Sequence, residues 1–114
     1  YNAKNEEAAE RYAQIADHIG LGGTTTAEKV DALIAELRSM NDQLDIPQAI
    51  KFYGAGGVKA ETSIIDEAEF LEKLPTVAAN AIGDACTGSN PRQPSQEEME
   101  KLLKACYYDL EIDF

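Results

Sequence analysis

The chain has 114 residues, enough for one domain, with 44% hydrophobic and 27% charged residues. Its 21 acidic residues outnumber its 10 basic ones, and the net charge of −11 repels phosphate backbones and anionic surfaces. We therefore expect neither nucleic acid nor a membrane as a partner, and no apolar run approaches the ~20 residues of a membrane span.

The first predicted helix covers residues 5–19 and ends at Gly20, a residue suited to the left-handed conformation that follows many helices. Its predicted apolar face consists of Ala8, Tyr12, Ile15, Ala16 and Ile19. The second helix begins with a capping box between Thr25 and Glu28 and continues to about residue 44. Its apolar stripe recurs at helical spacing and consists of Val30, Leu33, Ile34, Leu37, Met40 and Leu44.

Proline and glycine interrupt the middle of the chain. Pro47 suits the first turn of a short helix that reaches about Tyr53. Residues 54–65 start with Gly-Ala-Gly-Gly and are interpreted as a loop. Another long helix is predicted over residues 66–85, and Pro75 is expected to kink or restart it, because proline lacks the N–H that a helix interior needs. Asp66 and Glu69 are predicted to form a capping box at its start.

The last predicted helix covers residues 96–107 and is capped by Ser95 and Glu98. Its predicted buried face consists of Met99, Leu102, Leu103 and Cys106. The tail, residues 108–114, alternates apolar and acidic side chains, which is compatible with an extended segment, although we favour a disordered tail. No strand is evident, so the fold class is all-α, with about five helices in one bundle.

The segment 84–94, Asp-Ala-Cys-Thr-Gly-Ser-Asn-Pro-Arg-Gln-Pro, carries the most specific pattern of the chain. Its glycine, asparagine and prolines predict a rigid turn with the thiol of Cys86 at its entrance. We expect structural roles for Asn90, Pro91 and Arg92, with Arg92 pairing with a carboxylate or binding helix-end carbonyls. Asp84 is expected to receive Arg92 or to cap a turn.

This segment resembles the C-terminal end of the iron-containing alcohol dehydrogenases, in particular the alcohol dehydrogenase half of bifunctional aldehyde-alcohol dehydrogenases. The stretch 11–23, Arg-Tyr-Ala-Gln-Ile-Ala-Asp-His-Ile-Gly-Leu-Gly-Gly, resembles the same family, as does Ile-Pro at 46–47. Residues 54–65 fit the resemblance poorly and are interpreted as an insertion. The resemblance covers most of the chain and places it in the helical domain of the dehydroquinate synthase-like fold.

The resemblance implies that the full-length enzyme reduces acetaldehyde to ethanol with NAD and Fe²⁺ as cofactors, in fermentative bacteria. The family holds its metal with one Asp and three His, which by resemblance lie upstream of Tyr1. We therefore expect residues 1–114 to be a single helical subdomain truncated from a larger enzyme. We expect it to bind no metal or cofactor by itself, to be inactive alone, and to have the rest of the parent polypeptide as its partner.

Cys86 is the one candidate for a functional side chain. By resemblance it forms part of the substrate-pocket wall, whereas its residue type alone also fits a small buried apolar group at a helix end. His18 has no second histidine and is interpreted as solvated, and Cys106 as core packing. The glycine-rich stretches 20–23 and 54–57 lack the dinucleotide-binding pattern and are interpreted as a helix end and a loop.

A reducing cytoplasm fits the two cysteines, which form neither a disulfide framework nor a metal-ligand spacing. The alternative to an enzyme subdomain is a helical interaction or assembly module without a catalytic role. Exposed apolar surface on a severed subdomain would let such a chain form homo-oligomers.

Overall fold

The computed structural model describes residues 1–114 and contains four α-helices and no strand. The α-helices are α1 (Glu6–His18), α2 (Thr26–Gln43), α3 (Glu67–Gly83) and α4 (Gln96–Tyr108). Short 3₁₀ turns occupy Asn2–Lys4, Ile50–Phe52, Ala55–Gly57 and Thr87–Ser89. The predicted all-α class is confirmed, with four helices where about five were expected. The difference is the segment after Pro47, which forms only a 3₁₀ turn at Ile50–Phe52 in place of the short helix.

Polar caps define the helix starts. Both predicted capping boxes, at α2 and α4, are present. The side chains of Thr25 and Ser95 each accept a hydrogen bond from the backbone N–H of a glutamate, and the carboxylate of that glutamate accepts one from the backbone N–H of the cap residue. At α3, Asp66 accepts from two backbone N–H groups, but Glu69 forms an ion pair with Lys73 and the reciprocal half of the predicted box is missing. Each cap satisfies N–H groups that have no partner within the helix.

The end of α1 has the predicted glycine geometry. Gly20 has φ +75°, and the N–H groups of Leu21 and Gly20 donate to the carbonyls of Ala16 and Asp17 at 3.0 and 3.1 Å. This is the paired bonding of a Schellman motif, which closes the last turn of a helix. It leaves His18 on the exposed last turn of α1.

The third helix differs from its prediction at Pro75. α3 continues through this proline from Glu67 to Gly83, so no restart occurs. It ends two residues earlier than predicted, and Ala85 lies in the following turn. In the preceding segment, Tyr53 and Lys59 form an isolated antiparallel bridge. Gly56 at φ +78° prevents the turn at Ala55–Gly57 from extending into a helix.

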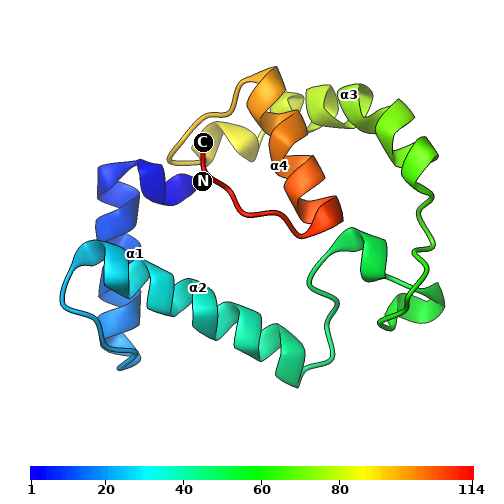
Figure 1. Ribbon diagram of the computed structural model, residues 1–114. Helices are drawn as coiled ribbons and strands as arrows, with labels where there is room; N and C mark the ends of the chain where they lie inside the picture. Colours follow the sequence, from blue (N-terminus) through cyan, green and yellow to red (C-terminus); the bar gives the residue numbers. More distant parts are fainter.

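The helices form two pairs. α1 packs on α2 and α3 packs on α4, and Figure 1 shows the pairs side by side with both chain termini between them. Phe70 and Tyr107 hold the second pair together, with stacked rings 4.2 Å apart between centroids. The first pair meets through alanines, because Ala8, Ala13 and Ala16 are buried.

Burial differs from the predicted faces in three helices. Ile15 and Ile19 were expected inside but are 48% and 53% exposed, because α1 meets α2 through its alanines. Most of the α2 stripe is likewise exposed, with Val30 as its one buried member. On α4, Cys106 is exposed while Ala105 and Tyr107 are buried, so the core role predicted for Cys106 is wrong. Only 11 of 114 residues are buried, and no large side chain is completely enclosed.

The tail after α4 is extended and returns toward the N-terminus (Figure 1). The ring centroids of Phe114 and Tyr1 lie 5.9 Å apart, and Nζ of Lys4 donates to the carbonyl of Asp113 at 3.2 Å. These contacts support the extended alternative over the disordered tail that we favoured. The reversal begins at Asp109, whose φ of +60° turns the chain out of α4.

Candidate functional site

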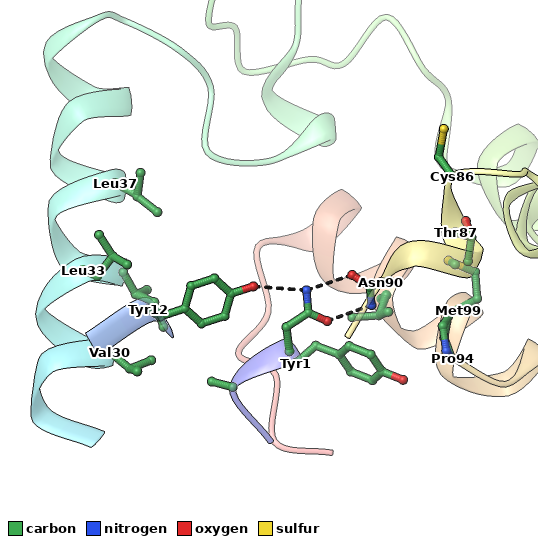
Figure 2. A pocket seen from close by; sticks show the side chains of 14 residues that line it. Tyr1, Tyr12, Val30, Leu33, Leu37, Cys86, Thr87, Asn90, Pro94 and Met99 are labelled. Atoms are coloured by element: carbon green, nitrogen blue, oxygen red, sulfur yellow. Dashed lines mark hydrogen bonds between the residues drawn. The ribbon is translucent and has the colours of Figure 1, made fainter. Parts of the chain in front are cut away.

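The main cavity of the molecule lies between the two helix pairs and has a volume of about 690 Å³ (Figure 2). Its lining combines the N-terminal segment, Tyr12 of α1, the apolar side of α2, the segment 84–94 and α4. The lining residues are Tyr1, Asn2, Ala3, Tyr12, Val30, Leu33, Ile34, Leu37, Cys86, Thr87, Asn90, Pro94, Met99 and Leu102. None of these side chains is acidic or basic, although 27% of the residues in the chain are charged.

Cys86 lies in this lining and is exposed, so the structure does not place it as a buried apolar group. Its backbone N–H donates to Oδ1 of Asp84 at 2.7 Å, which gives Asp84 the turn-capping role of its two predicted alternatives. The Cys86 carbonyl accepts from the Ser89 hydroxyl at 2.7 Å. Neither histidine nor lysine contributes to the cavity lining, so nothing there activates the thiol as a nucleophile.

The turn that follows Cys86 is fixed by side-chain bonds to the backbone. The Thr87 hydroxyl donates to the carbonyl of Ala81 at 2.6 Å and ties the turn to the end of α3. Nε2 of Gln93 lies 3.1, 3.1 and 2.8 Å from the carbonyls of Thr87, Gly88 and Asn90. The predicted rigid turn is therefore present, held by groups within the motif and by α3.

Asn90 connects this turn to the other half of the molecule. Its amide group exchanges two hydrogen bonds with Asn2: Nδ2 of Asn2 donates to Oδ1 of Asn90 at 3.0 Å, and Nδ2 of Asn90 donates to Oδ1 of Asn2 at 2.8 Å. Nδ2 of Asn2 also lies 3.4 Å from the hydroxyl of Tyr12 on α1. Figure 2 shows Tyr12 and Asn90 on opposite sides of this hydrogen-bonded chain. The sequence indicated a local role for Asn90 but not this pairing, because Asn2 lies 88 positions away in a segment without a motif.

Arg92 joins both chain ends to the same turn. Nη2 forms an ion pair with Oε1 of Glu98 at 2.7 Å, and Nη1 donates to the carbonyl of Phe114 at 2.8 Å. The guanidinium also lies 3.9 Å from the ring centroid of Tyr1, a cation–π contact. The predicted pairing of Arg92 with a carboxylate is confirmed, with Glu98 in place of Asp84 as the partner.

One group near Arg92 has a shifted pKa. The pKa of Glu98 is lowered, chiefly because the Ser95 N–H donates to its carboxylate, with the Tyr1 hydroxyl and Arg92 adding to the effect. The folded state therefore favours the Glu98 carboxylate that pairs with Arg92.

The remaining candidates lie outside the cavity. His18 is exposed at the end of α1, and no group of three or more His, Cys, Asp or Glu side chains is placed to hold a metal ion. Cys106 is exposed on α4, and partial burial raises the pKa of its thiol. No helix is both long and apolar enough to cross a membrane.

Known proteins are similar to this sequence. A family model described as "Fe-containing alcohol dehydrogenase family, C-terminal" matches residues 1–107. The NADPH-dependent butanol dehydrogenase of Clostridium saccharobutylicum is 43% identical over 114 residues, which is 100% of this chain and 26% of that protein. The bifunctional aldehyde-alcohol dehydrogenase of Escherichia coli (strain K12) is 38% identical over 104 residues, 90% of this chain and 10% of that protein.

An alcohol dehydrogenase of Thermococcus barophilus is 32% identical over 109 residues, 96% of this chain and 24% of that protein. The chain thus spans about a quarter or less of the length of these relatives. The family match covers the N-terminal segment and the turn at residues 84–94, the parts that the Asn2–Asn90 pair joins.

Proposed function

Because the chain belongs to the Fe-containing alcohol dehydrogenase family, we propose that it is the C-terminal helical part of an NAD-dependent, iron-containing alcohol dehydrogenase. The proposed reaction is the reduction of acetaldehyde to ethanol, and the aldehyde and alcohol in the name of the bifunctional E. coli relative support this class of reaction. The family match over residues 1–107 carries this proposal.

The residues of this chain do not fit an iron site. Iron in such enzymes needs several converging nitrogen and oxygen ligands, whereas His18 is the single histidine and lies exposed at the end of α1. No cluster of potential ligands exists elsewhere in the chain. The glycines at 20–23 follow a helix rather than a strand, so they do not form a dinucleotide-binding turn. We therefore assign metal and cofactor binding to polypeptide outside these residues.

The proposed role of the chain is to form one wall of the cleft and part of its scaffold. The hydrogen bonds of Thr87, Gln93 and Asp84 hold the Cys86 turn rigid, which suits a wall that must keep its shape. Within this wall we propose that Cys86 contacts substrate through its shape and polarity. A serine at this position would preserve the size and change the polarity.

A chimera tests the role of the chain. The chain replaces the matched quarter of the C. saccharobutylicum butanol dehydrogenase, and NADPH oxidation with butyraldehyde is measured. We expect an active chimera, an inactive 114-residue chain with added Fe²⁺ or Zn²⁺, and a Cys86→Ser chimera with altered KM. Turnover by the isolated chain, or a folded chimera with no activity, would contradict the proposal.

The assignment of substrate and cofactor must be tested in the longer native polypeptide, because the chimera takes its cofactor site from the relative. Rates with acetaldehyde and butyraldehyde, each with NADH and with NADPH, discriminate the proposed NAD-dependent ethanol chemistry from NADPH-dependent butanol chemistry. A preference of more than tenfold for NADPH would replace the first assignment by the second. The 43% identity to the butanol enzyme is the observation that favours this competing assignment.

A helical assembly module is the second candidate function. The observation that favours it is the exposure of fourteen large hydrophobic residues, among them Leu44 at 62% and Ile64 at 62%. Light scattering over a range of concentrations tests it. A monomer at every concentration would exclude homo-oligomer assembly by this chain, whereas a defined dimer or filament would support the assembly function.

A further inference from the structure

We propose that Asn2 and Asn90 are positioning residues, and that their amide pair fixes where the Cys86 thiol lies in the cavity. Neither amide is assigned a contact with substrate, because both act through the turn that carries Cys86. The inference rests on the proposed function, in which Cys86 forms part of the substrate-pocket wall, and it identifies the contact that sets the position of this wall.

The turn from Asp84 to Asn90 is one hydrogen-bonded unit. The backbone N–H groups of Thr87, Ser89 and Asn90 each donate to the carbonyl three positions earlier, at 3.1, 3.1 and 3.0 Å. The Ser89 hydroxyl also donates to the carbonyl of Cys86 at 2.7 Å. Because these bonds overlap along the turn, a displacement of Asn90 is transmitted to Cys86.

Two anchors hold this unit, one on each side of the cavity. The Thr87 hydroxyl donates to the carbonyl of Ala81 at the end of α3, at 2.6 Å. On the other side, the unit makes two side-chain hydrogen bonds to the N-terminal segment, and both join Asn90 to Asn2. Nδ2 of Asn2 in turn lies 3.4 Å from the hydroxyl of Tyr12 on α1. Without the Asn2 amide, the unit would keep the anchor to α3 and lose the hydrogen-bonded one to the first helix pair.

The geometry of the amide pair suits positioning. Each amide donates and accepts, so the two bonds of 3.0 and 2.8 Å fix the orientation of the partners as well as their separation. The net stability gained from such bonds is modest, because the unfolded chain bonds to water instead. Figure 2 shows Cys86, Thr87 and Asn90 on one side of the cavity, with Tyr12 on the other. Supporting contacts of this kind hold a binding residue in its productive geometry.

Thiol labelling in the butanol dehydrogenase chimera tests the position of Cys86. Asn2→Ala removes both bonds of the pair and leaves the turn itself unchanged in sequence. We expect iodoacetamide to label Cys86 at least about threefold faster in this variant, because a turn with one anchor opens more often. Cys106 is the internal control, since it is exposed on α4 outside the cavity lining, and its labelling rate should change less than about twofold.

A second variant and a matched control separate positioning from a general loss of stability. Asn2→Asp keeps the size of the side chain and the acceptor for Nδ2 of Asn90, but its carboxylate cannot donate, so we expect an intermediate rise in Cys86 labelling. Tyr107→Phe removes a hydrogen bond of 2.9 Å to the carbonyl of Ile65, which is also partly buried and long-range but lies outside the cavity lining. This control should leave Cys86 labelling within about twofold of the wild-type rate. Failure of both Asn2 variants to fold would count against a positioning role.

Steady-state kinetics with butyraldehyde test whether this position matters to substrate. A contact in the pocket wall acts on substrate binding, so KM should rise at least about threefold in Asn2→Ala, while kcat and the KM for NADPH stay within about twofold. In a Cys86→Ala background the same substitution should raise KM less than about 1.5-fold, because the side chain that the pair positions is absent.

Three results would overturn the positioning role: equal KM rises in the two backgrounds, an equal KM rise in Tyr107→Phe, or faster Cys86 labelling with an unchanged KM in an active chimera. The two proposals also fail in different ways. A folded chimera without activity refutes the proposed function, and Cys86 labelling then still decides whether the amide pair positions the thiol. An active chimera in which Asn2→Ala alters neither Cys86 labelling nor KM refutes the positioning role alone.

Discussion

At the scale of single residues, the Asn2–Asn90 amide pair is the most informative contact of the chain. It joins segments 88 positions apart, and each amide both donates and accepts. Asn90 also donates to the carbonyl of Arg92, at 2.5 Å. Because both amides are partly buried, removing one leaves the other with unsatisfied groups rather than with water.

We expect Asn90→Ala to lower the free energy of unfolding by about 1–3 kcal/mol, the cost of stranding a polar partner. Urea unfolding monitored by circular dichroism measures the change. Asn80→Ala is the matched control, since Asn80 is exposed on α3, and it should change stability by less than about 0.5 kcal/mol. Equal effects of the two substitutions would show that the pair contributes nothing.

Residue patterns predicted part of this site. The motif around Cys86 predicted a rigid turn and a carboxylate partner for Arg92, because those preferences are local. The partner of Asn90 and the return of Phe114 to Tyr1 could not be predicted, since both depend on how distant segments meet. Cys106 was assigned to the core from its place in an apolar stripe, but α4 instead buries the neighbouring Ala105 and Tyr107.

At the scale of elements, the start of α2 shows how one side chain makes the stability of a helix depend on pH. Glu28 accepts hydrogen bonds from the hydroxyl and N–H of Thr24 and from the N–H of Thr25, at 2.5, 2.8 and 3.0 Å. These bonds, the Thr24 hydroxyl first, lower the pKa of Glu28 to about 2. A lowered pKa means that the folded state favours the carboxylate.

The stabilisation from Glu28 should therefore be complete above its unfolded pKa of 4.5 and should disappear as pH falls toward about 2. Comparison of the melting temperature of the wild-type chain with that of Glu28→Gln from pH 6 to pH 2 tests this. The wild-type advantage should shrink across that window. The control for the loss of one negative charge is Glu36→Gln, because Glu36 lies half-buried in the middle of α2. A constant difference across the pH range would contradict the prediction.

Element boundaries followed local chemistry where caps decide them. The starts of α2 and α4 were predicted from Thr25 and Ser95, because a capping side chain acts within four residues. Pro75 was predicted to interrupt α3, yet the helix continues. The Pro75 carbonyl accepts from Gln96 at 3.1 Å, a contact with the start of α4 that helps to hold this turn and that no local pattern reveals.

At the scale of the whole molecule, the chain has helices but little interior. It extends 43 × 32 × 23 Å, with 11 of 114 residues buried. Amphipathic periodicity predicted the four long helices but assumed that every apolar stripe faces a core within the chain. The stripe of α2 instead faces an open cavity, and Ile15 and Ile19 of α1 face outward. Such stripes are expected where apolar surface is completed by further polypeptide.

This shape predicts weakly cooperative unfolding of the isolated chain. The denaturant slope m scales with the surface exposed on unfolding, and small proteins give about 1–3 kcal/mol/M in urea. Because no large side chain is completely buried, the surface gained on unfolding is small, and we expect a slope of about 1 kcal/mol/M or less.

The dye ANS reports the same property independently, since it binds exposed apolar surface. Its fluorescence should rise with the native chain and should fall when Leu37→Glu and Ile34→Glu place charges on the cavity face. Val77→Glu, on an exposed aliphatic of α3 outside the cavity lining, is the control and should have a smaller effect. A slope above about 2 kcal/mol/M together with no ANS binding would mean that the two helix pairs close on each other in solution.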